Sequence, residues 1–247
     1  MKNFSLVLAF VLSTVFACSQ DHHAPHWSYE GKTGPAHWGD LTAEYSLCKT
    51  GQEQSPINIA NHVAANLPPI DFHYLPSPLK LIDNGHTVQV NYAPGSYITV
   101  SGKKYELLQF HFHHPSEEEI NGKHYDLVIH LVHKDAESHL AVVAVLFKEG
   151  ASDAAIKAVV DHLPTTQEQE MTTDETIDAT TLLPQTRNYY TFAGSLTTPP
   201  CTEGVTWFVL QTPSTLSDPE LKTLAKLYPH NVRPVQPLNA RTVKAGN

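Results

Sequence analysis

The sequence is poor in positive charge. Its 16 lysines and arginines are outnumbered by 25 aspartates and glutamates, which gives a formal net charge of −9. This balance argues against nucleic acid or an anionic membrane as a partner. The chain also lacks an internal repeat, a low-complexity block, a charge run and a Gly/Ser-rich linker, so one domain is the simplest account of its 247 residues.

The apolar run near the N-terminus lacks the length to span a bilayer. It extends from Leu6 to Phe16 after the positive Lys2, which is typical of a signal peptide. We therefore expect residues 1–17 to be a signal peptide and the mature protein to lie outside the cytoplasm. Residues 15–18, Val-Phe-Ala-Cys, resemble a bacterial lipobox, although Phe16 is bulky for its position. A lipid on Cys18 and a soluble secreted product both stay open.

Cysteine is scarce, with three in the chain. Besides Cys18, the mature protein would contain Cys48 and Cys201, an even number in an oxidising compartment. A disulfide between these two would close a loop of 153 residues. On the chain-entropy model such a bond contributes at most about 5 kcal/mol to stability. Two free buried thiols are the alternative, and we favour the disulfide.

The segment after the signal peptide is polar and irregular. We expect residues 18–26 to be a flexible tether and residues 27–247 to be the folded domain. His22, His23 and His26 in the tether could bind a stray metal ion, but a solvated tail is the favoured interpretation. An aromatic segment that begins at Trp27 is expected to dock onto the domain.

Strand patterns dominate the domain. The predicted strands cover residues 70–75, 79–82, 86–92, 97–100, 105–113, 126–133, 140–147, 189–192 and 205–211. Asp83-Asn84-Gly85 between two of them is a hairpin-turn signal. With 41% hydrophobic residues the chain can bury a sizeable core. The expected fold class is mostly β (α+β), a single domain built on one large sheet with a few surface helices.

Helix signals are few. Ser152-Asp153 is suited to cap a helix that places Ile156 and Val159 on one face. Asp218-Pro219 predicts a second helix, with Asp218 as its N-cap and a proline in its first turn. Both helices are expected on the surface of the sheet.

The most informative stretch is Gln109-Phe110-His111-Phe112-His113, in a chain with 16 histidines. Histidines alternate with phenylalanines, so a strand here has one imidazole face and one apolar face. Two histidines that are two residues apart on one face of a strand are separated by about 6.5–7 Å along the backbone, which suits two ligands of one metal ion. His130 lies 17 residues beyond His113 in another strand pattern, so pairing of the two strands would bring three imidazoles together.

Three neutral imidazoles with an open fourth position are typical of catalytic rather than structural zinc. A structural zinc site would normally be closed by four ligands, often cysteines, and neither Cys48 nor Cys201 lies near these histidines in sequence. A half-buried histidine without a metal is the alternative for any one of them. A cupin is the chief rival fold, because His111-x-His113-x3-Glu117 with a later histidine fits an iron or manganese site in which Glu117 is a ligand. The flanking glycines and the Pro-x-Gly turn of that pattern are missing here.

Four motifs together resemble one family. They are Gln54-Ser-Pro-Ile-Asn58, Gln109-Phe-His-Phe-His113, His130-Leu-Val-His133 and Gly194-Ser-Leu-Thr-Thr-Pro-Pro200. In this order they resemble an alpha-class carbonic anhydrase of the bacterial secreted (periplasmic) type, over nearly all of the chain from Trp27 to Arg241. The resemblance implies a central twisted, mainly antiparallel sheet and a cofactor Zn²⁺ at the foot of a conical cleft. It also implies reversible hydration of CO₂ to bicarbonate and a proton by zinc-bound hydroxide.

The resemblance also implies roles for individual residues. It maps the zinc ligands onto His111, His113 and His130. It maps the catalytic residues onto Thr197, which bonds the hydroxide, Glu117, which accepts from Thr197, and His86, the proton shuttle. It maps the apolar CO₂ pocket and its rim onto Val132, Val142, Leu196, Thr198, Val205 and Trp207. It maps the ligand supports and the water network onto Tyr29, Asn84, Gln89, Gln109 and Asn231. Cys48 and Cys201 match the disulfide of the bacterial members. His86 has a plainer interpretation as an exposed residue after a hairpin turn.

Two positions depart from the family pattern. The family usually has a glutamate two residues before the third ligand, where this chain has Val128, and a histidine where this chain has Glu118. Loss of a hydrogen-bond partner of a metal ligand typically costs 10–100-fold in metal affinity or activity. We therefore predict weakened zinc retention unless water or a neighbouring strand supplies an oxygen to His130, and slower zinc loss in Val128→Glu.

The sequence thus favours an exported zinc carbonic anhydrase whose partner is a small molecule, CO₂ or bicarbonate, and which meets a membrane only through a lipid on Cys18. The protein is expected in the periplasm, secreted, or anchored to the outer membrane, as a monomer or homodimer. A non-enzymatic relative that binds a ligand or scavenges zinc is the second class. Such relatives usually lose ligand histidines, and all three are present here.

Overall fold

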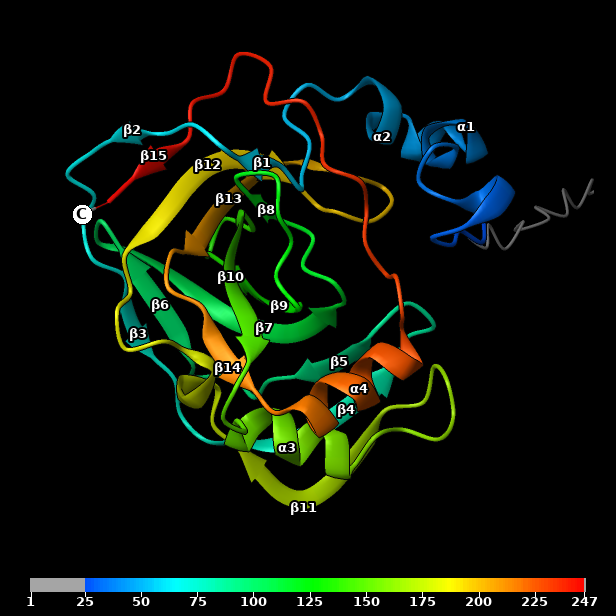
Figure 1. Cartoon of the computed structure of the whole chain (residues 1–247), viewed down its shortest axis with the longest axis vertical. Helices are drawn as coiled ribbons and strands as arrows, with labels where there is room; N and C mark the ends of the chain where they lie inside the picture. The colour runs from blue at the N-terminus through cyan, green and yellow to red at the C-terminus, as the bar shows by residue number, and fades with distance from the viewer. Residues whose placement is uncertain (1–24, 247) are drawn as a thin grey trace, which may run out of the picture.

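The computed structural model describes residues 25–246 (Figure 1). The expected signal peptide and residues 18–24 of the expected tether lie outside the described residues. The strands are β1 (Asn58–Ile59), β2 (Val63–Ala64), β3 (Asp71–His73), β4 (Ser77–Asp83), β5 (Val88–Asn91), β6 (Tyr97–Val100), β7 (Lys103–His113), β8 (Glu119–Ile120), β9 (Leu127–Lys134), β10 (Leu140–Glu149), β11 (Met171–Ile177), β12 (Tyr189–Ser195), β13 (Glu203–Leu210), β14 (Ser214–Leu216) and β15 (Lys244–Ala245). The α-helices are α1 (Trp38–Leu41), α2 (Leu47–Thr50), α3 (Ala154–Asp161) and α4 (Asp218–Leu227), and the 3₁₀ helices are η1 (Gly31–Thr33), η2 (Ala43–Tyr45) and η3 (Ala179–Leu182). None of the helices in the described range is long and apolar enough to cross a membrane.

One sheet of 13 strands organises the molecule. Its main path runs β11-β4-β5-β7-β9-β10-β13-β12-β15-β2, with β14 beside β10 and β6 beside both β3 and β7. Most neighbours are antiparallel, whereas β10 is parallel to β13 and β14. The predicted mostly β fold with one large, mainly antiparallel sheet is therefore confirmed.

Both faces of the central strands are buried. Along β10, Val143 and Val145 face the larger apolar cluster, and Val142 and Ala144 face the smaller one. The period of two residues explains this division, because neighbouring side chains of a strand point to opposite faces. Helices α3 and α4 lie side by side in Figure 1 at the end of the sheet that carries β4 and β11. The apolar composition of β9 and β10 reflects burial on both sides.

The pairing of β7 with β9 positions the histidines. His111 pairs directly with His130, and His113 pairs with Val128. On its other side, β7 pairs with β5 through Gln89 and His111. Phe110 and Phe112 point away from the histidines into the larger core cluster, as the alternation predicts. The predicted strand pairing is thus present in the centre of the sheet.

Local signals explain where the two longer helices begin. Asp153 is the N-cap of α3 and accepts hydrogen bonds from the backbone N–H groups of Ala155 and Ile156. Helix α4 begins one residue earlier than predicted, because Ser217 is its N-cap in a capping box with Glu220 and Asp218 is its first residue. Burial of the periodic apolar residues then fixes both helices against the sheet.

All nine predicted strands overlap observed ones, but His86, the first residue of the predicted strand 86–92, lies outside the observed strand β5. β5 begins at Val88, and residues 84–87 form the turn after β4. Asn84 Oδ1 accepts hydrogen bonds from the backbone N–H groups of His86 and Thr87 at 3.0 and 2.9 Å, so the side chain holds the turn closed. The hairpin signal therefore outweighs the strand preference of His86 and Thr87.

The predicted disulfide between Cys48 and Cys201 is confirmed. It connects α2 to the segment between β12 and β13, which contains Thr197 and Thr198. The alternative of two free thiols is excluded in this structure.

Candidate active site and metal centre

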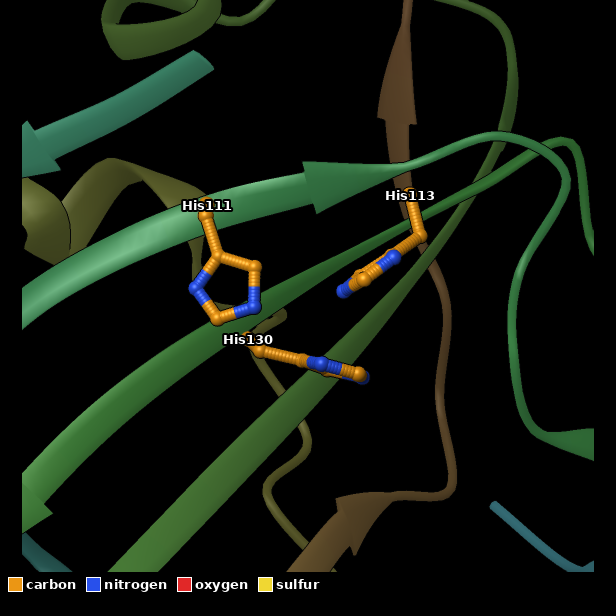
Figure 2. Close-up of side chains that lie close together, drawn as sticks. All are labelled: His111, His113 and His130. Carbon is orange, nitrogen blue, oxygen red and sulfur yellow. The ribbon is translucent and has the colours of Figure 1, made fainter. Parts of the chain in front are cut away.

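Three imidazole rings converge at the centre of the sheet (Figure 2). His111 and His113 come from β7, and His130 comes from β9. The ring centroids are 4.8–5.5 Å apart, and one nitrogen of each ring lies within 4.8 Å of the others. Strand pairing alone brings these nitrogens together, since His111 and His130 are direct cross-strand neighbours.

Two of the rings are oriented by neutral oxygen acceptors. His111 Nδ1 donates to Gln109 Oε1 at 2.9 Å, and His113 Nδ1 donates to the backbone carbonyl of Asn231 at 2.6 Å. Each bond fixes the proton on Nδ1 and leaves Nε2 as the lone-pair nitrogen. The side chain of Asn231 also accepts from the backbone N–H of His114 at 2.9 Å, which secures the acceptor of His113.

The ring of His130 uses its two nitrogens in the opposite way to His111 and His113. His130 Nε2 donates to Glu118 Oε1 at 3.1 Å, so Nδ1 is the nitrogen that remains for a metal ion. Glu118 stands where the family pattern has a histidine, and its contact with His130 was not predicted from the sequence. Its carboxylate is fully buried. Burial raises its pKa to about 7.

The three histidines fit a metal ion. Burial lowers the pKa of His113 to about 4 and lowers the pKa of His111 and of His130 well below the ordinary value, so all three are neutral at pH 7. Metal-binding imidazoles must be neutral. His113 Nε2 is buried and has no hydrogen-bond partner among the described residues. A buried acceptor without a partner is costly, and a coordinated cation would satisfy it.

Glu117 lies beside this group without belonging to it. Its Oε1 accepts from the backbone N–H of Arg233 at 2.8 Å, and its Oε2 is 3.6 Å from His113 Nε2 and 3.9 Å from His130 Nδ1. Burial raises the pKa of Glu117 to about 8, and the Thr197 hydroxyl opposes this rise. Within residues 25–246, the group of convergent ligand atoms at this site contains the three histidines and not Glu117, so the cupin site with Glu117 as a fourth ligand is not formed.

A cleft of about 170 Å³ opens onto the histidines. It is lined by 13 further residues: Trp27, Tyr29, Asn84, His86, Thr87, Gln89, Gln109, Val132, Val142, Leu196, Thr197, Thr198 and Trp207. The cleft therefore contains most of the site residues expected from the sequence. Val205 is an exception, because it is buried in the smaller core cluster with Trp207 and is not part of the lining.

One wall of the cleft is apolar because of the way residues pair across three neighbouring strands. Val132 of β9 pairs with Val142 of β10, and Val142 pairs with Trp207 of β13. Three adjacent strands thus place apolar side chains side by side on one face. Trp207 is fixed further by a hydrogen bond from its Nε1 to the carbonyl of Ser195 at 3.1 Å.

The loop after β12 brings Thr197 and Thr198 to the cleft. Just before the loop, in the last residues of β12, Gly194 is required because a Cβ there would collide with Ser55 Oγ and lie 2.7 Å from Trp207 Cδ1. At its end, the backbone N–H of Cys201 donates to the carbonyl of Thr198 at 2.8 Å. The loop conformation is therefore set by close packing at one end and by a turn and a disulfide at the other.

His86 lies at the cleft under aromatic cover. Its ring stacks on Trp27 with centroids 3.6 Å apart and planes 10° apart, and Tyr29 meets it edge-on at 6.4 Å. Burial and the neighbouring His26 lower the pKa of His86. Trp38 holds the aromatic segment from Trp27 together, because its buried indole donates through Nε1 to the carbonyls of Ser28 and Thr33.

The remaining polar residues have defined partners. Gln89 lines the cleft and donates to Asn91 Oδ1 at 2.6 Å, whereas the Asn84 side chain is used to close its turn. Trp27 and Thr87 in the cleft lining and Arg233 beside Glu117 were not predicted from the sequence as parts of the site. Arg233 approaches Glu117 from 116 residues away, and nothing in its local sequence signals that contact.

The fold and the site define a large-sheet β protein with a three-histidine centre of the kind that catalytic metal ions occupy, at the base of a cleft with one apolar wall. The chain belongs to the eukaryotic-type carbonic anhydrase family, whose sequence profile matches residues 33–247. It is accordingly an enzyme of the carbonic anhydrase type.

Individual relatives cover nearly the whole chain. A carbonic anhydrase of Klebsiella pneumoniae is 45% identical over 241 residues, which cover 96% of this chain and 95% of the relative. A carbonic anhydrase of Neisseria gonorrhoeae is 43% identical over 245 residues, which cover 98% and 96%. Among solved structures, the complex of the alpha-carbonic anhydrase of Thermovibrio ammonificans with the inhibitor sulfanilamide matches with a TM-score of 0.87 and 43% identity, over 90% of this chain and 100% of that one.

Proposed function

We propose that this protein catalyses the reversible hydration of CO₂ to bicarbonate and a proton with Zn²⁺ held by His111, His113 and His130. The family supports CO₂ hydration as the activity. The observation that carries the metal assignment is the convergence of three buried, neutral imidazoles, each with its outer nitrogen bonded to an oxygen. When bound, Zn²⁺ supplies a nucleophile at neutral pH by lowering the pKa of a water ligand to about 7, an effect for which carbonic anhydrase is itself the standard example.

Thr197 and Glu117 are proposed to orient the attacking oxygen. An opposite charge favours the ionised form of a carboxyl group, so a divalent cation on the neighbouring histidines would lower the pKa of Glu117 from its raised value. Ionised Glu117 can only accept, so the Thr197 hydroxyl donates to it. The Thr197 oxygen then accepts from the O–H of the nucleophile, whose lone pair is left for the carbon of CO₂.

The apolar wall is proposed to hold CO₂. Val132, Val142 and Trp207 offer an uncharged surface next to the histidines, and Leu196 and Thr198 line the cleft beside them. Because CO₂ has no net charge and no hydrogen to donate, a dry apolar surface competes with water for it better than polar groups would. Val205 packs with Trp207 in the smaller core cluster and supports this wall.

His86 is proposed to carry the product proton to solvent. The hydration reaction releases one proton per turnover, and an imidazole that changes protonation near neutral pH is suited to relay it. His86 lies on the lining of the cleft, and Tyr29 and Gln89 on the same lining are further hydrogen-bonding groups. These two side chains are proposed to order water along the path.

The disulfide and the bacterial relatives support a site of action outside the cytoplasm. We propose that residues 1–17 direct export to the periplasm or the medium, that residues 18–26 form a tether, and that residues 27–247 form the catalytic domain. A lipid on Cys18 would anchor the protein to the outer membrane, and mass spectrometry of the native N-terminus distinguishes the anchored from the free form.

Stopped-flow measurement of CO₂ hydration tests the proposal. The zinc-loaded protein is expected to hydrate CO₂ with about one zinc per chain, and His111→Ala is expected to lose both zinc and activity. Sulfanilamide, the inhibitor bound to the Thermovibrio ammonificans enzyme, is expected to inhibit the wild-type protein. Zinc binding without hydration would instead identify a zinc-binding relative that has lost the activity.

A further inference from the structure

The partner of His130 differs in kind from the partners of the other two histidines. Gln109 and Asn231 offer neutral oxygens, and Glu118 offers a carboxylate. A carboxylate acceptor makes an imidazole ligand more basic and fixes its tautomer and ring orientation. His130 is therefore the one ligand of the three, within the described residues, with an acidic hydrogen-bond partner.

The strand that carries His130 provides no such partner. Val128 lies two residues earlier, on the same face of β9, and its buried side chain packs in the smaller core cluster. An isopropyl group cannot accept a hydrogen bond. Without an oxygen from elsewhere, His130 Nε2 would be a buried donor with no partner, which is costly.

Glu118 supplies that oxygen from the turn before β8. Both of its carboxylate oxygens lie near His130 Nε2, Oε1 at 3.1 Å and Oε2 at 3.3 Å. The turn is fixed by Ser116, whose hydroxyl donates to the carbonyl of Glu118 at 2.7 Å and accepts from the backbone N–H of Tyr125 at 2.9 Å. The carboxylate is thus presented to His130 by a hydrogen-bonded scaffold.

We propose that Glu118 is the residue that positions His130 for metal binding, and that it does so in place of the carboxylate that β9 lacks at Val128. The two departures from the family pattern then compensate for each other, with the acidic group moved from the ligand strand to the facing turn. This replaces the sequence-based prediction of weak zinc retention. The inference rests on the proposed zinc site at His111, His113 and His130.

Glu119 gives a matched control. It is the next residue, it has the same side chain, and its Oε1 lies 3.3 Å from Nε2 of His124, a histidine outside the metal centre. Loss of the Glu119 carboxylate tests what a carboxylate–histidine pair near β8 contributes to folding. Loss of the Glu118 carboxylate tests the same chemistry on a metal ligand.

The experiment measures zinc loss from the zinc-loaded protein to an excess of chelator. Glu118→Ala is expected to lose zinc about 10–100-fold faster than wild type. Glu118→Gln, which keeps the shape and one acceptor oxygen, is expected to fall between the two and serves if Glu118→Ala does not fold. Glu119→Gln is expected to lose zinc at the wild-type rate. An unchanged rate in both Glu118 variants would overturn the proposal.

Relocation of the carboxylate provides a second test. In Glu118→Ala/Val128→Glu the acidic group returns to β9, and zinc loss is expected to be slower than in Glu118→Ala alone. Val128→Glu alone would put a second acidic group against His130 and is expected not to slow zinc loss. Two ratios of zinc-loss rates are compared: Val128→Glu against wild type, and Glu118→Ala/Val128→Glu against Glu118→Ala. If both ratios show the same slowing, the effect of Val128→Glu does not depend on Glu118, and Glu118 is not the positioning group.

A spectroscopic measurement separates positioning from general stability. The visible absorption of the Co²⁺-substituted protein responds to ligand orientation and is expected to change in Glu118→Gln and not in Glu119→Gln. Identical spectra for Glu118→Gln and wild type would contradict the proposal. The proposed function and this inference fail in different ways. If the wild-type protein neither binds zinc nor hydrates CO₂, the proposed function is wrong. If the wild-type protein does both and the Glu118 variants behave like wild type, the inference alone is wrong.

Discussion

At the scale of single residues, the site depends on which atom of each side chain is already used. The inner nitrogens of the three histidines face one another because oxygens of Gln109, Asn231 and Glu118 occupy the outer ones. The same principle applies to Glu117, because the backbone N–H of Arg233 occupies its Oε1 and leaves Oε2 near His113 and His130, without a hydrogen-bond partner among the described residues. Hydrogen-bond partners outside the metal centre therefore determine which atom of each histidine and of Glu117 remains available inside it.

Thr197 provides a prediction at this scale. Thr197→Ala removes the hydroxyl that we propose donates to Glu117, and kcat/KM for CO₂ hydration is expected to fall about 10–100-fold, the size of a lost hydrogen bond to a charged group. Thr197→Ser keeps the hydroxyl and is expected to retain most of the activity. Stopped-flow kinetics at equal zinc content provide the comparison. Equal values for the alanine and serine variants would remove Thr197 from the proposed mechanism.

The role of a residue could be predicted from the sequence where it follows from the two-residue period of a strand. It could not be predicted where the residue reaches the site through tertiary contacts. His130 and His133 illustrate the first kind. Three residues apart on β9 they point to opposite faces, so His130 joins the metal centre and His133 is buried on the other side, bonded to the Tyr74 hydroxyl at 2.9 Å. The roles of Glu118 and Arg233 were not predictable, because their contacts with His130 and Glu117 depend on where a turn and a distant segment pack.

At the scale of elements, strands with a strong pattern were predicted and short or exposed ones were missed. β7 and β10 have clear alternation or continuous apolar character. β11 (Met171–Ile177) has no apolar alternation to detect, since it is an exposed edge strand along β4. β1, β2, β8 and β15 have two residues each and exist because their neighbours offer backbone partners. Tertiary pairing, which local sequence does not encode, creates these strands.

The aromatic segment near the N-terminus acts as an element that covers His86. Because Trp27 stacks on the imidazole and burial is the main cause of its lowered pKa, Trp27→Ala is expected to raise the pKa of His86 toward its ordinary value. His26, Asp83 and Glu168, the charged or titratable groups that act on His86, remain in this variant. NMR titration of the ring protons measures the shift, with His86→Ala assigning the resonance.

The matched control is Trp27→Phe, which keeps an aromatic ring over His86 and is expected to keep most of the pKa depression. Activity gives the functional counterpart. If His86 relays protons, the pH at which hydration becomes limited by proton export should rise in Trp27→Ala together with the pKa. A pKa in Trp27→Ala equal to that of wild type would show that Trp27 does not determine the environment of His86.

At the scale of the whole molecule, segments far apart in sequence are connected around the cleft. The Cys48–Cys201 disulfide joins α2 to the Thr197 loop, and Arg233 reaches the same region by donating to the carbonyl oxygens of Cys48 and Ser55 at 2.9 and 2.8 Å. The backbone of Arg233 also holds Glu117. The N-terminal segment, the loop after β12 and the C-terminal segment thus form one support for the metal centre.

The disulfide contributes to this support mainly through the unfolded chain. Its loop spans 153 residues, for which the chain-entropy model gives about 5 kcal/mol, and measured losses for native disulfides are typically about 2–5 kcal/mol. Cys48→Ser/Cys201→Ser is therefore expected to lower the free energy of unfolding by about that amount. Urea unfolding of the zinc-loaded protein measures it, with the reduced wild-type protein as a control that should match the double variant.

Activity is expected to respond less than stability. The hydrogen bonds of Arg233 and the turn from Cys201 N–H to the Thr198 carbonyl remain in the double serine variant, so Thr197 keeps its place at temperatures where the protein is folded. CO₂ hydration at 25 °C should then stay close to wild type although the urea midpoint falls. Loss of activity before any loss of folded structure would show instead that the covalent bond, and not the hydrogen-bonded segment around Arg233, positions the Thr197 loop.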